Sequence, residues 1–305
     1  MARRLELVVP GDCEGVRVDT LLRKRLGLSG TVIRRMKWLE DGILVDGVRV
    51  NTRFVPQPGQ VLSVRLSEPE RRSGVVGAEG VIDIVYEDGD ILVVNKPAGL
   101  SVHPGPGHWA DTLGNFLVGY YQRTGQEADF HPVHRLDRGT SGLLVCAKHP
   151  HAQEVLKEQL HTSAFVREYL ALCDGVPVPA DGVVDAPLGA REGSLVEQCV
   201  RPDGKSARTN YHTLGVADGR ALLRLTLDTG RTHQIRVHMA HLGCPLTGDF
   251  LYGVERPEVI GRPALHSHRL CLRHPITGEE LEFVCPVPED MARLFEAEKF
   301  DAYLV

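Results

Sequence analysis

The stretch His134-Arg135-Leu136-Asp137-Arg138-Gly139-Thr140-Ser141-Gly142-Leu143-Leu144-Val145 joins a polar turn to an apolar strand. Its one carboxylate, Asp137, has an arginine two residues before it and another directly after it. A turn rich in Gly, Ser and Thr above a rigid sheet is a common way to present one reactive side chain, and a nearby guanidinium keeps a carboxylate ionised and oriented. A surface salt bridge on a turn, which contributes little to stability, explains the same residues. This stretch alone leaves both interpretations open.

Strand patterns dominate the chain on both sides of this stretch. Six apolar segments bounded by turn residues are expected as strands: Ile82–Tyr86, Ile91–Val94, Leu143–Ala147, Tyr169–Cys173, Ala207–Leu214 and Ala221–Leu227. Helical patterns are fewer, at Thr112–Arg123, at His151–His161 and near Thr232–Leu242. Because strands and helices do not alternate regularly, the pattern predicts an α+β domain over residues 80–305. This domain is expected to contain a mainly antiparallel β-sheet with flanking helices.

Residues 1–66 have a different pattern, which predicts a small αα–ββ domain. Asp19 and Ser29 are suited to cap two short amphipathic helices. Asp46-Gly47 lies between two short apolar runs and suits the tight type I′ turn of a hairpin. Residues 67–79, which follow, lack periodicity and are rich in charge and glycine, which is typical of a linker.

Charge is distributed unevenly along the chain. The net charge is −5, yet residues 1–73 hold fourteen Lys and Arg against nine Asp and Glu, and the remaining residues hold twenty-one against thirty-one. A local positive patch can attract RNA even on an acidic chain. The candidate RNA-binding side chains on the two expected helices are Arg23, Lys24, Arg25, Arg34, Arg35 and Lys37. The ordinary solvated face of a helix pair explains this charge equally well.

A second stretch with unusual chemistry is Leu227-Asp228-Thr229-Gly230-Arg231-Thr232-His233-Gln234-Ile235-Arg236-Val237-His238. Its pattern predicts a strand end, a glycine turn and the start of a helix. Arg231 and Arg236 can direct guanidinium groups at one anionic ligand. The helix dipole disfavours cations at a helix N-terminus, so their presence here indicates a function.

Motifs for phosphate loops, dinucleotides and metals are incomplete. Residues 204–206 lack the glycine that a phosphate loop needs five positions earlier, and residues 105–110 lie in a proline-rich loop about ten residues past their strand. His233, His238 and His241 have no second pair of ligands to complete a tetrahedral set. The seven cysteines are scattered, with no C-x-x-C pair. The sequence therefore predicts no metal site.

Several stretches together resemble the RluA-type pseudouridine synthases. Residues 134–142 are similar to the catalytic motif of that family. The other matching segments, in the family's order, are Asn95–Gly99, Phe165–Tyr169, Gly230–Arg236, Gly248–Gly253 and Leu265–Leu270, the last followed by His274-Pro275. Residues 1–66 resemble the small RNA-binding module named after ribosomal protein four of the small subunit, which often precedes this catalytic domain.

The resemblance implies an enzyme that isomerises uridine to pseudouridine in RNA. It implies that Asp137 is the catalytic carboxylate, which either attacks the anomeric carbon or removes a proton from the neighbouring sugar carbon. It places Arg236 in a pair with Asp137, Tyr169 against the uracil, near the carbon-5 proton, and Leu265 in the uracil pocket. Arg135 is expected to enter the space left by a flipped nucleotide. An isomerisation exchanges no electrons or external groups, so no cofactor is expected.

Two positions depart from the family pattern, and simpler roles remain open for three others. Gly139 stands where relatives often carry a larger polar residue, and Arg167 where many carry lysine. Core packing alone would also explain Tyr169 and Leu265, and a solvated turn would explain Arg135.

Two other classes of protein fit part of the sequence. A noncatalytic RNA-binding or ribosome-assembly factor would account for the basic N-terminal segment, but not for Asp137, Tyr169 and Arg236 together. A glycoside hydrolase needs a second carboxylate as partner, and no second carboxylate motif accompanies Asp137. The resemblance implies RNA as the partner, either ribosomal or transfer RNA, since both are substrates of similar proteins. RNA recognition depends on shape and loops, so the sequence does not select between the two.

The remaining expectations concern location and assembly. No apolar run approaches the ~20 residues of a membrane-spanning helix, and the N-terminus lacks the apolar run of a secretory signal. The sequence therefore predicts a cytoplasmic protein with no membrane association. Nothing in it suggests more than a monomer, so a monomer with no obligate protein partner is expected.

Overall fold

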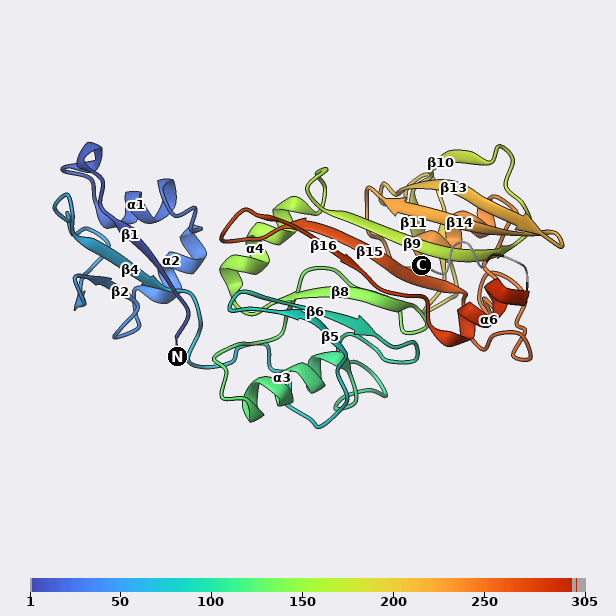
Figure 1. Ribbon diagram of the computed structural model, residues 1–305, viewed down its shortest axis with the longest axis horizontal. Coiled ribbons are helices and arrows are strands. Elements are labelled where there is room, and N and C mark those ends of the chain that lie inside the picture. Colours follow the sequence, from blue (N-terminus) through green and yellow to red (C-terminus); the bar gives the residue numbers. More distant parts are fainter. Residues whose placement is uncertain (1, 298–299, 301–305) are drawn as a thin grey trace.

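The computed structural model describes residues 2–297 and residue 300, which form two lobes joined by an extended segment (Figure 1). The predicted α+β class is confirmed. All pairs of neighbouring strands are antiparallel except β8 with β15, which is parallel. Among the described residues, no helix combines the length and the apolar composition needed to cross a bilayer.

The smaller lobe, at the left of Figure 1, contains the N-terminal part of the chain. Its elements are β1 (Arg4–Val8), a short 3-10 helix (Gly11–Cys13), α1 (Val18–Lys24), α2 (Gly30–Met36), β2 (Ile43–Val45), β3 (Val48–Arg49) and β4 (Val61–Arg65). The strands form one sheet in the order β1-β4-β2-β3, against which both helices bury apolar side chains. Asp46 and Gly47 both have positive φ, as a type I′ hairpin requires.

The two helices of this lobe begin in different ways. Ser29 caps α2 as predicted, because its side chain accepts a hydrogen bond from the Val32 amide at 3.2 Å. The prediction for Asp19 was wrong, since Arg17 occupies the N-cap position of α1 and Asp19 lies inside the first turn. There Asp19 pairs with Arg17 at 2.6 Å and interacts favourably with the helix dipole.

The larger lobe is built on a ten-stranded sheet. Along the chain its strands are β5 (Ile84–Glu87), β6 (Ile91–Lys96), β7 (His131–Pro132), β8 (Ser141–Ala147), β9 (Val166–Asp174), β10 (Asp181–Asp185), β13 (Arg208–Ala217), β14 (Arg220–Leu227), β15 (Leu265–Arg273) and β16 (Glu280–Val284). The main order is β10-β13-β14-β9-β15-β8-β6-β5, with β16 on β15 and β7 on β8. β11 (Leu188–Ala190) and β12 (Gln198–Val200) form a separate hairpin. Every residue of β8 is buried, which explains its continuous apolar sequence.

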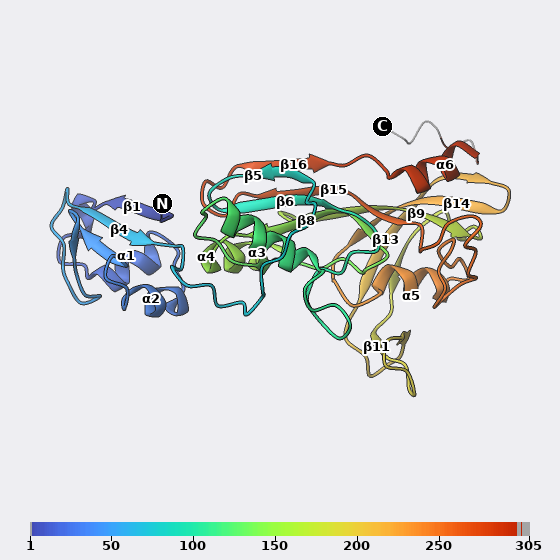
Figure 2. The same ribbon diagram turned by 90° about the horizontal axis from the view of Figure 1, so that it is seen from below.

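Helices cover both faces of this sheet. They are α3 (Leu113–Arg123), α4 (Pro150–Gln159), α5 (Gln234–His241) and α6 (Glu289–Ala297). Side chains alternate along β9, so Tyr169, Ala171 and Cys173 pack in one core with α3 and α5, whereas Leu170 and Leu172 pack with α6. Figure 2 shows α3, α5 and the β11–β12 hairpin on one side of the sheet and α6 on the other.

Residues 67–79 contain no helix or strand, yet they bind the larger lobe closely. The Arg71 guanidinium donates a hydrogen bond to the Ala128 carbonyl at 3.0 Å. The Asp129 carboxylate accepts from the Ser73 amide at 2.7 Å. The segment that the sequence marks as a linker is therefore anchored along the surface of the larger lobe.

Charged side chains join the two lobes directly. Arg3 donates two hydrogen bonds to Asp90 in the β5–β6 turn, at 2.7 and 2.8 Å. Arg65, at the end of β4, donates to Glu127 at 2.5 Å. The Leu66 amide donates to the Arg3 carbonyl at 2.8 Å, so both ends of the small lobe meet the larger lobe side by side.

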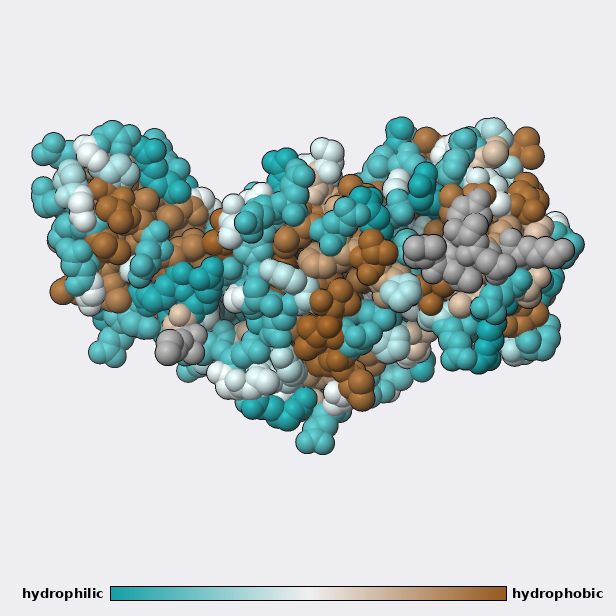
Figure 3. Space-filling view, viewed as in Figure 1, coloured by the Kyte–Doolittle hydropathy of each residue, from teal (hydrophilic) through white to brown (hydrophobic). Residues whose placement is uncertain are grey.

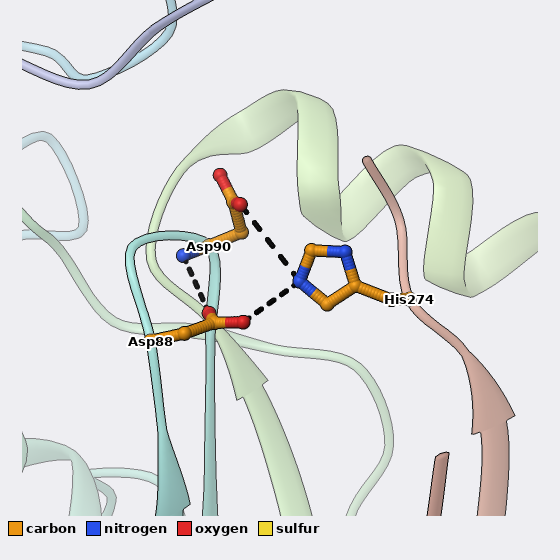
Figure 4. A group of neighbouring side chains, drawn as sticks. All are labelled: Asp88, Asp90 and His274. Carbon is orange, nitrogen blue, oxygen red and sulfur yellow. Dashed lines mark hydrogen bonds and ion pairs between the residues drawn. The ribbon is translucent and has the colours of Figure 1, made fainter. Parts of the chain in front are cut away.

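Asp90 belongs to a group of side chains that could in principle ligate a cation (Figure 4). The His274 Nε2 atom lies 2.8 Å from an Asp88 oxygen and 3.8 Å from an Asp90 oxygen. The other Asp90 oxygen lies 2.9 Å from His149 Nε2, and Arg3 donates a hydrogen bond to each of the two Asp90 oxygens. Burial raises the pKa of Asp90, but His149 and Arg3 lower it more strongly. These contacts occupy the carboxylate and place a cation beside it, so the group acts as a junction between the lobes.

Figure 3 shows one face of the molecule, on which apolar residues gather near β5 and the segment before it. Val81 and Val85 are exposed there to 89% and 40%. The small lobe shows a second apolar area near its centre in this view, surrounded by hydrophilic residues. The polar cavity described next borders α5, on the side of the sheet that faces away from α6.

Candidate active site

A cavity of about 490 Å³ opens between the turn before β8, the strand β9, the helix α4 and the start of α5. It is lined by all five side chains that the sequence selects for catalysis or substrate binding, namely Arg135, Asp137, Tyr169, Arg236 and Leu265. These residues lie between positions 135 and 265, and the pairing of β15 with β8 and β9 brings the turn of Asp137, Tyr169 and Leu265 together. Among the described residues that line the cavity, Asp137 is the only one with a carboxylate.

The turn that carries Asp137 is fixed through its backbone. The Thr140 amide donates to the Asp137 carbonyl at 3.1 Å, and the Gly99 amide donates to the Arg138 carbonyl at 2.7 Å. Gly142, two residues further on, has φ +108°, and a Cβ there would lie 2.2 Å from the Ser267 carbonyl oxygen. Only glycine allows β8 to approach β15 this closely.

A buried lysine supports the same turn from below. Lys96 ends β6, is fully buried, and donates to the carbonyls of Pro97 at 2.7 Å, Leu100 at 2.9 Å and Arg138 at 3.4 Å. Burial lowers the pKa of Lys96 to about 7, while the charge of Asp137 acts in the opposite direction. Lys96 thus connects the segment after β6 to the turn of Asp137.

The Asp137 side chain is half-buried and available to a ligand. Within the described chain, no group forms a hydrogen bond to its carboxylate. Its charge nevertheless acts on the cationic side chains around it, since it raises the pKa of Lys96 and Arg236 against the effect of burial. The site therefore combines one free carboxylate with a strongly cationic surrounding.

The structure corrects the direct pairing expected between Arg236 and Asp137. Arg236 is only 4% exposed and donates two hydrogen bonds to the fully buried Asp249, both at 2.7 Å. The pKa of Arg236 is raised, because these bonds and the charges of Asp249 and Asp137 outweigh burial. Its guanidinium also lies over the rings of Tyr252 at 5.0 Å and Phe250 at 5.6 Å. Arg236 therefore interacts with Asp137 through its charge, while hydrogen bonds to Asp249 hold the Arg236 guanidinium in place.

Tyr169 and Leu265 combine core packing with exposure to the cavity. They are 4% and 3% exposed and belong to the core cluster beneath α3 and α5, yet both line the cavity. Burial raises the pKa of Tyr169, which keeps its hydroxyl protonated at neutral pH. Arg135 is exposed at the rim, where the cavity meets a second hollow lined by His103 and Arg138.

The sequence assigns no role to several residues in or beside the cavity. Lys157 from α4 lines the cavity, as does Arg167 from β9, which is 4% exposed. Arg167 carried a signal, because it lies two residues before Tyr169 and so on the same side of β9. Asp249 lay inside a quoted stretch without a role. The sequence of α4 gave no signal for Lys157, because an exposed lysine on a helix is common and does not by itself indicate a function.

The basic residues of the small lobe differ in whether a carboxylate of the protein pairs with them. Arg25 pairs with Asp12 at 2.5 Å, and Arg35 pairs with Glu68 at 3.5 Å. Lys37 lies 4.8 Å from the ring centroid of Trp38, which is itself 76% exposed. Arg23, Lys24 and Arg34 are exposed on α1 and α2, and among the described residues none of the three has a carboxylate partner.

The histidines at the start of α5 are engaged with protein groups. His233 Nδ1 lies 2.7 Å from the Tyr252 hydroxyl. His238 lies 2.8 Å from the Thr209 hydroxyl and 3.0 Å from the Ala186 carbonyl. These contacts orient the first turns of α5 beside the cavity.

Comparison with known proteins gives a consistent result. Residues 90–241 match the family model described as RNA pseudouridylate synthase. The uncharacterized RNA pseudouridine synthase YjbO of Bacillus subtilis is 38% identical, with 90% of this chain and 96% of the relative covered. The ribosomal large subunit pseudouridine synthase D of Vibrio cholerae is 40% identical, with 100% and 98% covered. The structure of human RNA pseudouridylate synthase domain containing 4 is similar with a TM-score of 0.58 and 28% identity, over 71% of this chain and 93% of that one.

The family match includes the turn of Asp137, the strand of Tyr169 and the helix of Arg236. The likeness to the Vibrio cholerae protein also includes the small lobe, since it covers the whole chain. The predicted isomerase is thereby confirmed over the noncatalytic alternative and over a glycoside hydrolase. Among the described residues the cavity presents a single carboxylate surrounded by cations, and the comparisons show that this chain belongs to the RNA pseudouridylate synthase family, whose enzymes isomerise uridine in RNA.

Proposed function

We propose that the protein converts specific uridines of large-subunit ribosomal RNA to pseudouridine, with Asp137 as the catalytic carboxylate. Support for the substrate comes from four relatives named ribosomal large subunit pseudouridine synthase D, which are 36–40% identical to this chain. Transfer RNA is the alternative substrate.

The observation that carries the role of Asp137 is its position as the one carboxylate among the described residues on the wall of a cationic cavity. The reaction must break the bond between uracil N1 and the ribose anomeric carbon, and it must form a bond from C5 to that carbon. A carboxylate beside the sugar serves this purpose, as in glycoside hydrolysis. Asp137 either attacks the anomeric carbon or removes a proton from the adjacent sugar carbon. In both cases the ionised carboxylate is the reacting form.

The other cavity residues receive roles by their position. The target nucleotide must leave its stack to reach Asp137, and Arg135 at the rim can occupy the vacated space. Tyr169 presents a buried aromatic ring on which the detached uracil can stack while it turns. Leu265 adds an apolar wall. Arg236, held by Asp249, supplies fixed positive charge where the released base carries electron density.

The small lobe is proposed to supply RNA affinity. Its exposed cations Arg23, Lys24 and Arg34 can contact phosphates, and Lys37 stacks beside the exposed Trp38, which offers a surface for a base. Arg25 and Arg35 already have carboxylate partners, so their contribution is smaller. Phosphate contacts of this kind position an RNA without reading its sequence.

Tritium release from RNA labelled at uridine C5 tests the proposal. Transcripts of large-subunit ribosomal RNA and of transfer RNA are incubated with the full chain and with Asp137→Asn. We expect release from the ribosomal transcript by the wild type alone. Release from transfer RNA alone would overturn the substrate, and release by Asp137→Asn would overturn the role of Asp137.

A further inference from the structure

Arg167 differs from the other buried arginines of this protein. Four arginines of the described chain are more than nine-tenths buried, and three of them bind a carboxylate. Arg65 pairs with Glu127 at 2.5 Å, Arg236 with Asp249 at 2.7 Å, and Arg262 with Asp290 at 2.6 Å. Arg167, which is 4% exposed, has no carboxylate partner among the described residues.

The guanidinium of Arg167 is held in place but not saturated. Its Nη2 atom donates one hydrogen bond of 3.3 Å to the Leu227 carbonyl. Its Nε atom is buried and has no partner. An uncompensated buried cation with an unsatisfied donor is strongly unfavourable. Because Arg167 lines the cavity, an anionic ligand there would compensate the charge of its guanidinium.

The surroundings of Arg167 have the character of an anion site. Its Nη1 atom lies so close to Gly230 that a Cβ there would be 2.9 Å away. Gly230 precedes α5, and the amides of Gly230 and Thr232 form no hydrogen bond within the described chain. Arg167, Gly230 and Thr232 all border the cavity that contains Asp137. Free amides before a helix, together with a guanidinium, are how proteins bind phosphate.

We propose that Arg167 and the amides at the start of α5 bind the RNA phosphate adjacent to the target uridine. This inference rests on the proposed use of the cavity for RNA. Uracil is neutral, whereas each nucleotide of RNA carries one anionic phosphate, whose two free oxygens match the guanidinium fork. Clamping this phosphate fixes the ribose between the wall at α5 and Asp137. Arg167 is therefore a positioning residue that sets the sugar against the carboxylate.

The first test compares three single variants on the ribosomal transcript at fixed ionic strength. We expect Arg167→Met to lower kcat/KM by about tenfold or more, because a charge-assisted contact to phosphate is lost. Arg167→Lys keeps the charge without the fork, so its loss should be smaller. Arg269→Met is the control, since Arg269 pairs with Glu282 on the neighbouring strand, away from the cavity. The control should stay within about twofold of the wild type. Equal kcat/KM for Arg167→Met and the wild type would overturn the proposal.

Unfolding without RNA separates a ligand site from a structural role. Because removing an unpaired buried cation relieves an unfavourable group, the melting temperature of Arg167→Met should equal or exceed that of the wild type. A melting temperature clearly below that of the wild type, or failure to fold, would show that the guanidinium supports the fold and would contradict the proposal.

A neutral backbone substitution identifies the phosphate. RNA oligonucleotides that contain the modified uridine carry a methylphosphonate at the linkage on its 5′ side or on its 3′ side. At one of these linkages the wild type should lose about tenfold in kcat/KM, and Arg167→Met should lose less than about twofold more. Equal losses for both proteins at both linkages would overturn the phosphate contact. Turnover of unmodified RNA by the wild type reports on the proposed function independently.

Discussion

The cavity and the small lobe both concentrate positive charge, but they hold it differently. In the cavity, Arg167 and Arg236 are 4% exposed and fixed by the sheet and by α5. In the small lobe, Arg23 and Lys24 project into solvent from a seven-residue helix. Buried charges in a low-dielectric surrounding act strongly on the groups beside them, whereas exposed charges are screened and add up mainly as affinity. We therefore propose that the first region performs the chemistry and holds one phosphate, and that the second supplies most of the remaining attraction for RNA.

The largest effect should follow from Asp137→Asn. The amide can neither attack the sugar nor remove its proton, so turnover should fall by at least about a thousandfold. RNA affinity should stay within a few-fold, because the phosphate contacts remain. Tritium release and filter binding measure the two quantities. Asp185→Asn, at an exposed carboxylate paired with Arg208, is the control and should behave as the wild type. Substantial turnover by Asp137→Asn would contradict the role of Asp137 as the catalytic carboxylate.

The next effect concerns the carboxylate that holds Arg236. Asp249→Asn leaves a buried guanidinium without its partner, so the free energy of unfolding should fall by about 3–5 kcal/mol. Turnover should fall as well, because Arg236 is no longer fixed. Urea unfolding gives the stability. The double variant Arg236→Met with Asp249→Leu should recover much of the stability but none of the activity. Full stability of Asp249→Asn would show that the pair carries little of the fold.

Acidification should affect the two lobes unequally. All fourteen histidines lie beyond the small lobe. Burial lowers the pKa of His131, His151 and His266 to about 4 and that of His134 to about 3. Since these histidines have a pKa near 6.5 when unfolded, the unfolded chain binds more protons and stability falls as the pH drops from 6.5 to 4. The loss is at most about 1.4 kcal/mol per pH unit for each histidine.

Hydrogen exchange at pH 7 and pH 5 measures this difference. Amides in β6, β8 and β15 should lose protection at pH 5, whereas amides in β1 and β4 should change less. His266→Asn removes one of the titrating groups and should reduce the change in the larger lobe. The opposite order, with the small lobe losing more protection, would contradict the assignment of acid sensitivity to the buried histidines.

The smallest effect should come from removing residues 1–66. The cut follows Leu66 because the next segment is anchored by Arg71 and Asp129 and should stay with the larger lobe. RNA affinity should fall by about tenfold, with a shallower dependence on salt, because fewer counterions are released. Turnover at saturating RNA should remain. Affinity and salt slope equal to those of the full chain would show that the small lobe does not bind RNA.

Local features were predictable from the sequence, and long-range partners were not. The turn of Asp137 and the strand after it follow from neighbouring residues, as does the cap at Ser29. The cap at Asp19 was misplaced, because helix ends depend on backbone contacts as well as on residue type. The sequence of β1 does not by itself predict a strand. This segment forms a strand by pairing with β4, which lies about 57 residues later in the chain.

The active site shows the same division. Asp137, Tyr169 and Arg236 were selected through family motifs, and the sheet brings them to one cavity. Asp249, the partner of Arg236, could not be selected from the sequence, because it becomes a neighbour of Arg236 only when α5 and the following loop fold together. The missing partner of Arg167 is visible only when burial is known, because a sequence gives no count of the groups around a guanidinium.

The contacts at Arg3 and Leu66 give the small lobe two attachment points rather than one. The chain continues from Leu66 into the segment that is anchored on the larger lobe. Arg3, whose carbonyl accepts a hydrogen bond from the Leu66 amide, donates to Asp90 of the larger lobe. A body fixed at two adjacent points cannot swivel freely about a single peptide, so α1 and α2 keep a set distance and direction from Asp137. If the small lobe binds RNA as proposed, this double attachment would limit which uridine of a bound RNA reaches the cavity, so the dimensions of the RNA would contribute to substrate choice.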